Sequence, residues 1–214
     1  MPSYSAVLFD LDGTLLDTEA LAREAGLRAL SRMGFSPDAD YFDQLVGKDH
    51  DTSASLLKAR YGDLDMDRLD VLWKEESDKL KAEGVAIKPG AAELLDMLDT
   101  TGLPRAVVTS SHRDSASYKL ERSGLLDRFP FFIGFDDVSA AKPAPEPYLL
   151  AAERLGVDPR ACLVFEDSEP GAQAAWDAGM TVVQVPDLNP ATGDYAHHVA
   201  ETLLEGARKA GLID

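Results

Sequence analysis

The sequence predicts an α/β fold in which a parallel sheet core carries an inserted helical domain. Five short apolar runs stand out, namely AVLF at 6–9, AVV at 106–108, FFI at 131–133, CLVF at 162–165 and TVVQV at 181–185. These runs are continuously apolar rather than alternating, as expected for strands that are covered on both faces. Segments with helical patterns separate most of them, and this alternation of strands and helices is typical of a parallel sheet.

The stretch that follows the first run departs from this alternation. It extends for about 70 residues and contains several amphipathic helical patterns but no β-type run. We therefore expect a helical domain at 17–84, inserted into a core that is made of 1–16 and 85–214.

Capping residues bound the expected helices. The segment TEALAREAGLRALSRMG has Thr18 or Asp17 placed to cap its start and Gly34 to end it. The segment LDVLWKEESDKLKAEG places Trp73 among leucines at helical spacing, which favours a core position for this ring. In the core, helices are expected from Ala91, Ser115, Pro147 and Pro170, and three of these segments end in glycine, a common helix stop.

Composition and charge exclude several classes of protein. The chain has 214 residues, of which 45% are apolar, so it can bury a sizeable core. Its formal net charge of -17 would repel nucleic acid and anionic membrane surfaces, so we expect neither as a partner. The single cysteine, Cys162, cannot form an internal disulfide and is expected to be a small buried hydrophobe. The N-terminal segment has no charged leader and no long apolar stretch, which predicts a cytoplasmic protein.

The chemistry-bearing residues stand just after the apolar runs. In an open parallel sheet the ligand crevice lies beyond the carboxyl ends of the strands, so these residues should converge on one edge. They are Asp10, Asp12, Thr109, Ser110, Ser111, Lys142, Glu166 and Asp167. Four segments that are distant in the sequence would thus form one site.

This group of side chains predicts a phosphoryl site that holds a divalent cation. Crowded carboxylates repel one another unless a cation lies among them, and Mg²⁺ suits an oxygen site that also binds phosphate. Asp10 and Asp12 are two residues apart, so in an extended segment their side chains point the same way. Thr109 and Ser110 offer hydroxyl and backbone N–H donors to phosphate oxygens, and Lys142 adds a positive charge.

Each signal also has a simpler interpretation. The Asp-x-Asp-Gly-Thr motif could be a loop with helix-capping aspartates, and Thr-Ser-Ser could be a polar turn before a helix. Lys142 could be a solvated lysine in a loop that its prolines stiffen. Together, at the ends of the appropriate strands, these residues favour the phosphoryl site.

Four segments carry a more specific resemblance. They are DLDGTLLD at 10–17, VVTSS at 107–111, KPAPEPY at 142–148 and FEDSEPGAQAAWDAGM at 165–180. In order and spacing they resemble the four motifs of the haloacid dehalogenase superfamily, and the match covers essentially the whole chain. The chain is most similar to the branch with a helical cap inserted after the first motif, which holds β-phosphoglucomutases and many small phosphatases. The resemblance implies a Rossmann-like catalytic core and a helical cap domain.

The resemblance also implies catalytic roles. Asp10 would be the nucleophile that forms an aspartyl-phosphate, and Asp12 would be the general acid and base. Thr109, Ser110 and Lys142 would hold the transferring phosphoryl oxygens, with Thr109 and Lys142 counted among the catalytic residues.

The same resemblance implies a Mg²⁺ site. Asp10, the backbone carbonyl of Asp12 and Asp167 would hold the ion. Glu166 would be a further ligand or would orient the others.

The expected function is a Mg²⁺-dependent phosphatase of a small phosphorylated metabolite. The mutases of the resembled branch carry a cap histidine four residues after the linker threonine, where this chain has Ala22, and an arginine in the loop that here spans 47–50. Both departures disfavour a sugar-phosphate mutase, which is kept as the alternative. Lys48 and His50 of this loop are candidates for substrate contact, although a solvated loop is an equal possibility.

A signalling receiver is a third interpretation, from a different class of protein. Receivers also place a Thr or Ser and a Lys around a phosphorylated Asp, but they are about half this length and carry the Asp on the third strand. The substrate and the oligomeric state are not readable from the sequence, because fold does not decide specificity.

Overall fold

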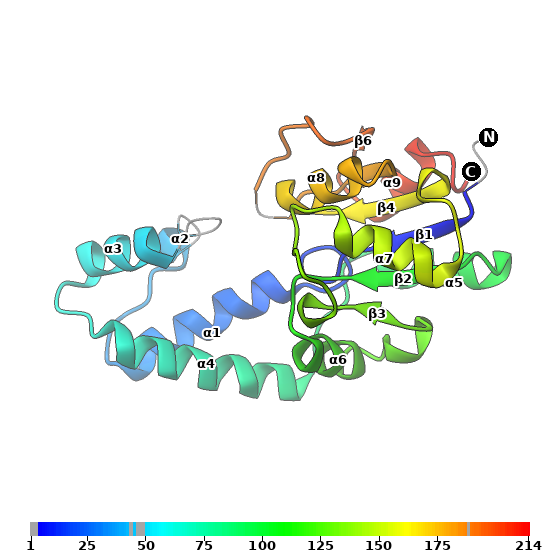
Figure 1. Cartoon of the computed structure of the whole chain (residues 1–214). Helices are drawn as coiled ribbons and strands as arrows, with labels where there is room; N and C mark the ends of the chain where they lie inside the picture. Colours follow the sequence, from blue (N-terminus) through cyan, green and yellow to red (C-terminus); the bar gives the residue numbers. More distant parts are fainter. Residues whose placement is uncertain (1–3, 43–44, 46–49, 188) are drawn as a thin grey trace. The chain divides into compact units, whose positions relative to one another are not determined.

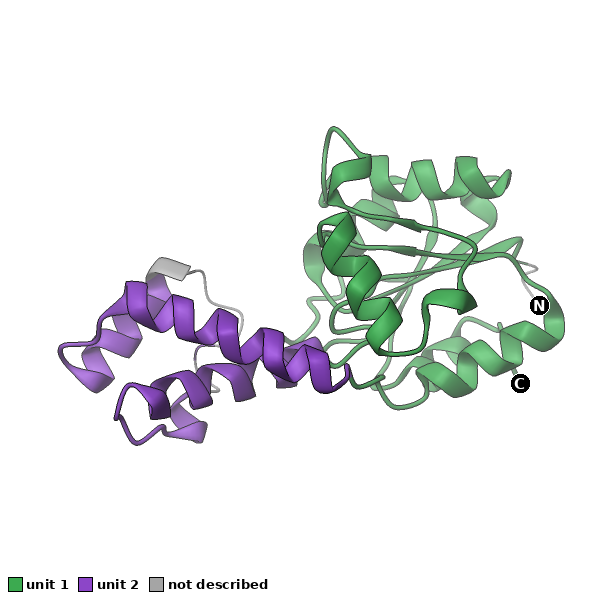
Figure 2. Ribbon diagram, turned by 90° about the horizontal axis from the view of Figure 1, so that it is seen from below, with its two compact units in different colours: residues 1–17, 86–214 green, residues 18–85 purple. Residues whose placement is uncertain are grey.

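The computed structural model describes residues 4–42, 45, 50–187 and 189–214. The chain forms two compact units, one of Met1–Asp17 with Ala86–Asp214 and one of Thr18–Val85 (Figure 2). Where the chain leaves and re-enters the first unit, the backbone N–H of Asp17 donates to Ala86 and that of Lys88 donates to Leu15. These bonds join the two crossing segments beside the end of the first strand.

The first unit contains a six-stranded parallel sheet, which confirms the predicted fold class. Its strand order is β3-β2-β1-β4-β5-β6 (Figure 1). The strands are β1 (Ala6–Phe9), β2 (Arg105–Val108), β3 (Phe132–Ile133), β4 (Cys162–Glu166), β5 (Thr181–Gln184) and β6 (His198–Val199). Each apolar run of the sequence forms one of the first five strands. The sixth, β6, was not predicted, because its two residues do not belong to an apolar run, whereas the equally short β3 lies within FFI.

Helices cover the sheet on both faces, as the continuously apolar strands predict. Leu8, Val164 and Val182 pack in one cluster with residues of α7 and α8. On the opposite face the rings of Phe9 and Phe165 stack with centroids 5.3 Å apart, and α9 packs close to Phe165. The helices of this unit are α5 (Ala91–Thr101), α6 (Arg113–Arg122), α7 (Glu146–Leu155), α8 (Glu169–Asp177) and α9 (Leu203–Lys209), with 3₁₀ turns η2 (Leu126–Arg128), η3 (Phe135–Asp137) and η4 (Pro159–Ala161).

The second unit consists of helices around a small apolar core. Its helices are α1 (Thr18–Arg32), α2 (Ala39–Phe42), α3 (His50–Tyr61) and α4 (Met66–Glu83). Leu30 and Leu69 are fully buried between α1 and α4. The ring of Trp73 packs against this core at 5.2 Å from that of Phe42, and its indole N–H donates to the Ala22 carbonyl. Trp73 is therefore a structural residue, as its spacing predicted.

None of the helices in the described ranges has the length and apolar character that crossing a membrane requires.

Gly26 allows the close approach of α1 to two aromatic rings in this helical unit. An added Cβ would lie 2.3 Å from Cζ of Phe42 and 2.9 Å from Cε2 of Trp73. Gly26→Ala should therefore lower the free energy of unfolding, although alanine favours a helix over glycine by about 1 kcal/mol. Urea unfolding followed by circular dichroism measures the change. Ala20→Gly, at an exposed position of the same helix, gives the size of the propensity difference with the opposite sign. An increase in stability of Gly26→Ala would contradict the packing argument.

Candidate active site

The carboxyl ends of the central strands bring the predicted residues together. Asp10 follows β1, Glu166 ends β4 and Asp167 follows it, and these three carboxylates each place an oxygen within 4.8 Å of the others. Lys142, from the segment between η3 and α7, inserts its ammonium group among them. Its Nζ lies 2.7 Å from Oδ1 of Asp10 and 2.5 Å from Oε1 of Glu166, and it also donates to the Val108 carbonyl at the end of β2. Four distant segments thus meet at one site.

Both carboxylate oxygens of Glu166 accept hydrogen bonds. It is fully buried, and its Oε1 accepts from the hydroxyl of Tyr148 at 2.7 Å as well as from Lys142. Its Oε2 accepts from the hydroxyl of Ser168, which also caps α8 by accepting from the Gly171 N–H. An added Cβ on Gly171 would lie 1.9 Å from Oε1 of Glu166. The first turn of α8 therefore requires glycine here to leave room for the carboxylate.

A second glycine makes room for Asp167. Gly13 has φ +85°, a left-handed conformation that favours glycine. Its Cβ, if present, would lie 2.4 Å from Oδ2 of Asp167 and 3.4 Å from Oδ2 of Asp187. Thr14 contacts Oδ1 of Asp167 at 3.5 Å. The turn after β1 thus allows the loops after β4 and β5 to approach the segment that carries the paired aspartates.

The electrostatics of this cluster suit a cation. Burial raises the pKa of Asp10 to about 7, with further increases from the charges of Glu166 and Asp12, although Lys142 opposes the shift. Burial raises the pKa of Asp167 to about 8, and the charges of Asp10 and Glu166 add to this. Burial acts to lower the pKa of Lys142, but the same two carboxylates raise it overall. One ammonium group therefore leaves excess negative charge, and an all-oxygen donor set fits a hard divalent ion.

Asp12 lies in a different environment from Asp10. Its side chain is 28% exposed and accepts from the ammonium group of Lys119, which lies 2.5 Å from Oδ1 and also contacts Oδ2. The hydroxyl of Ser111 donates to Oδ2 at 2.8 Å, and that of Thr109 approaches it at 3.5 Å. The expected role of Asp12 at the metal through its backbone carbonyl stays a prediction.

The segment after β2 differs from expectation in one respect. Thr109 is buried, and its backbone N–H donates to the Ile133 carbonyl, because the pairing of β2 with β3 continues for one residue. Its hydroxyl accepts from the Ser111 N–H. Thr109 can therefore offer its hydroxyl but not its N–H to a phosphate. Ser110 is exposed beside it.

Sequence reasoning missed two charged pairs at this edge. Lys119 of α6 occupies the same helix face as buried Ala116 and Leu120. A lysine on an otherwise apolar helix face was the sequence signal that could have indicated a buried charge. Asp187 follows β5, so the rule that found the other carboxylates would have found it too. Its Oδ1 pairs with Lys88 at 2.5 Å, and its Oδ2 is buried with no hydrogen-bond partner.

The two substrate-contact candidates of the cap remain untested. Lys48 lies outside the described residues, and for His50 the structure describes only its place at the start of α3.

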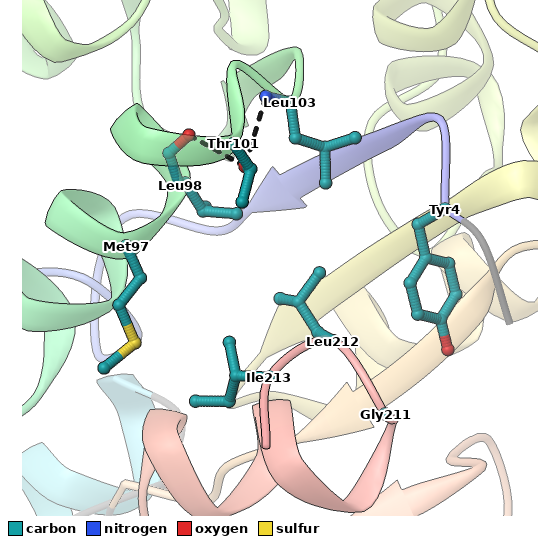
Figure 3. A pocket seen from close by; sticks show the side chains of 8 residues that line it. All are labelled: Tyr4, Met97, Leu98, Thr101, Leu103, Gly211, Leu212 and Ile213. Atoms are coloured by element: carbon teal, nitrogen blue, oxygen red, sulfur yellow. Dashed lines mark hydrogen bonds between the residues drawn. The ribbon is translucent and has the colours of Figure 1, made fainter. Parts of the chain in front are cut away.

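A separate apolar pocket lies at the other end of the sheet. It has a volume of about 210 Å³ and is lined by Tyr4, residues of α5, Leu103 and residues 211–213 (Figure 3). Tyr4 and Leu103 stand before β1 and β2, whereas Asp10 and Thr109 stand after them. The pocket is therefore distinct from the carboxylate cluster.

The comparisons with known proteins agree with this geometry. The sequence model of the haloacid dehalogenase-like hydrolases matches residues 7–185, a range that includes Asp10, Asp12, Glu166 and Asp167 as well as Lys119 and Lys142. The chain belongs to this family. It is 34% identical over 188 residues to the fructose-1-phosphate phosphatase YqaB of Escherichia coli, covering 85% of this chain and 96% of that protein. It is 33% identical over 176 residues to a phosphorylated carbohydrates phosphatase of Thermotoga maritima, covering 82% of each.

Solved structures of the family superimpose over nearly the whole chain. A haloacid dehalogenase family hydrolase of Deinococcus radiodurans with bound phosphate and sodium has a TM-score of 0.83 at 29% identity, covering 100% of this chain and 99% of that one. A "putative beta-phosphoglucomutase" of Thermotoga maritima also has a TM-score of 0.83 at 29% identity, covering 98% and 100%. The present chain is therefore similar both to proteins named as phosphatases and to one named as a putative mutase.

The raised pKa values predict how pH affects the metal-free protein. The pKa values of Asp10 and Asp167, about 7 and about 8, exceed the ordinary 3.8, so the folded state retains protons that the unfolded state releases. These retained protons contribute stability that is fully present below about pH 4 and is lost as the pH rises to about 8. The midpoint of thermal unfolding in a chelator should fall over this interval, and Mg²⁺ should raise it more at pH 8 than at pH 5.

Differential scanning fluorimetry across this pH range checks both effects. Asp167→Asn is the matched control, because removal of one titrating carboxylate should make the fall shallower and the effect of Mg²⁺ smaller. A parent whose pH profile matches that of Asp167→Asn would contradict the electrostatic argument.

Proposed function

We propose that the chain is a Mg²⁺-dependent phosphatase that hydrolyses a small phosphorylated metabolite through an aspartyl-phosphate on Asp10. The observation that carries this proposal is the contact of the Asp10 carboxylate with Lys142, beside Glu166 and Asp167, at the carboxyl edge of the sheet. The relatives named as fructose-1-phosphate and phosphorylated carbohydrates phosphatases support a sugar phosphate or a similar small molecule as the substrate. The cytoplasmic location expected from the sequence stays a prediction.

Asp10 suits the role of nucleophile. Its side chain is 9% exposed, and the ammonium group of Lys142 holds Oδ1, which fixes the direction of the carboxylate. A carboxylate oxygen of Asp10 would bond to phosphorus while the ester oxygen leaves. The same ammonium group would attract the phosphoryl oxygens, where developing negative charge needs fixed positive partners. The hydroxyl of Thr109 and the exposed Ser110 would supply further donors.

Asp12 suits the two proton transfers. In the first step it would protonate the leaving oxygen, and in the second it would take a proton from the water that attacks the aspartyl-phosphate. The second step breaks the bond between phosphorus and Asp10 and releases inorganic phosphate. Asp12 is two residues from Asp10 and 28% exposed, so it can meet both a leaving group and a water.

Mg²⁺ is the cation that we propose for the carboxylate cluster. Asp10 and Asp167 would hold it, together with the carbonyl of Asp12, and Glu166 would orient these ligands through its contact with Lys142. The ion would neutralise charge on the transferring phosphoryl group. Chelation should stop activity, and Mg²⁺ should restore it far better than Ca²⁺, whose longer bonds and higher coordination number could misalign a nucleophilic carboxylate.

The nucleophile can be tested directly. Asp10→Asn should reduce phosphate release to background in Mg²⁺, because an amide of nearly the same shape is a far weaker nucleophile. The measurement is inorganic phosphate released from a panel of sugar phosphates, nucleotides and phosphoglycolate, with circular dichroism to verify the fold. Asp96→Asn, which changes an aspartate that is 71% exposed, is the matched control and should retain parental rates. Equal rates for Asp10→Asn and its parent would exclude Asp10 as the nucleophile.

A sugar-phosphate mutase is the second candidate, because the chain superimposes on a mutase-like structure over nearly its full length. The absence of the cap histidine at Ala22 and of an arginine at 47–50 favours water as the phosphoryl acceptor. Incubation with β-glucose 1-phosphate should therefore give free sugar and inorganic phosphate, without acceleration by a bisphosphate primer. Phosphorus NMR over time distinguishes the products. Accumulation of an isomeric sugar phosphate with little inorganic phosphate would favour the mutase.

A further inference from the structure

Lys119 is a buried lysine, and in the part of the chain that the structure describes its ammonium group hydrogen-bonds only to Asp12 and Ser111. It lies on α6 and is 5% exposed. Its Nζ donates to both carboxylate oxygens of Asp12 and, at 2.7 Å, to Oγ of Ser111. Ser111 in turn donates to Oδ2 of Asp12. The three N–H bonds of the ammonium group are thus all used, and the three side chains form a closed triangle.

Fold stability alone does not account for this lysine. Lysine is almost never fully buried unless it is paired, and replacing a buried ion pair with apolar residues is often neutral or stabilising. Its neighbours on the same helix face, Ala116 and Leu120, are apolar. A methionine or leucine at 119 would fit this pattern without a buried charge. The charge therefore serves the partner that it contacts, which is Asp12.

The surroundings hold Lys119 and Ser111 in fixed positions. Asp136 of η3 accepts from the Arg113 N–H at 2.7 Å and so fixes the start of α6. The Phe135 N–H donates to the Ser111 carbonyl at 2.9 Å. Both the helix that carries the ammonium group and the turn that carries the hydroxyl are therefore attached to the same 3₁₀ turn. The side chain of Asp12 is 28% exposed, against 6% for that of Lys119, so Asp12 is the side chain that Lys119 and Ser111 can orient.

We propose that Lys119, with Ser111, positions the carboxylate of Asp12 for its proton transfers. Lys119 is thus a positioning residue that acts through Asp12, in the way that Lys142 acts on Asp10. The proposal rests on the proposed function, because it requires Asp12 to be the general acid and base. It assigns the second buried lysine of the site a role distinct from phosphate binding.

A double-mutant cycle tests whether Lys119 acts through Asp12. The variants are Lys119→Met, Asp12→Asn and the combination of both, with p-nitrophenyl phosphate and fructose 1-phosphate as probes in Mg²⁺. Lys119→Met should lower kcat by roughly 10-fold to 100-fold, and the KM should stay within about twofold of the parental value. In the Asp12→Asn background the same change should alter kcat by less than about threefold, because the residue on which it acts is already lost.

Matched variants separate positioning from folding. Lys209→Met, at an exposed lysine of α9 that pairs with Glu205, should retain parental kcat and KM. If Lys119→Met fails to fold by circular dichroism, Ser111→Ala replaces it in the cycle. Ser111→Ala removes one donor to Asp12 and should lower kcat by about threefold to tenfold, again without a further effect in the Asp12→Asn background.

The other outcomes overturn the proposal in distinguishable ways. A parental kcat in Lys119→Met would exclude the positioning role and leave the proposed function intact. If Lys119→Met does not fold, a parental kcat in Ser111→Ala would have the same meaning. A raised KM with unchanged kcat would mean that Lys119 binds the substrate itself. Multiplicative losses in the double variant would mean that Lys119 acts independently of Asp12. Parental activity in Asp12→Asn, or a parent that releases no phosphate, would refute the proposed function, and the positioning role would fall with it.

Discussion

The ammonium group of Lys142 neutralises two carboxylates that the ends of β1 and β4 bury beside each other. The side chains of Asp10 and Glu166 are 9% and 0% exposed, and two unpaired charges at this depth would destabilise this end of the sheet. The surrounding structure is arranged around this contact. Tyr148 and Ser168 satisfy the remaining oxygens of Glu166, and Gly171 leaves the space that its carboxylate occupies. The site is thus also a packed part of the core.

Two different lysines contact Asp10 and Asp12, so the two aspartates lie in different environments. Lys142 contacts Asp10 beside other buried carboxylates, whereas Lys119 contacts Asp12 on the more exposed side of the same turn. Two identical side chains, two residues apart, therefore face different charges and different amounts of water. Such a difference in environment is what allows one carboxylate to attack phosphorus and another to transfer protons.

The fold could be predicted because its signal is local. A strand that is covered on both faces must be apolar at every position, so the five runs stood out, and the insertion was visible as a long stretch without such a run. The strand β6, His198–Val199, was not predicted because it is not buried on both faces and so lacks the apolar run that marked β3, the other two-residue edge strand. The helix starts were predicted to within a few residues, since capping residues lie next to the turns that they stabilise.

The sequence by itself determined the fold class and the edge of the sheet at which Asp10, Glu166 and Asp167 meet, because a position just after a strand is a property of the local chain. Only the tertiary structure decided which cation each aspartate contacts. Lys119 lies 107 residues from Asp12, and Lys88 lies 99 residues from Asp187. These pairings depend on the rotation of α6 about its axis and on the packing of loops against Gly13. Such relations arise between distant segments, and no local pattern of residues specifies them.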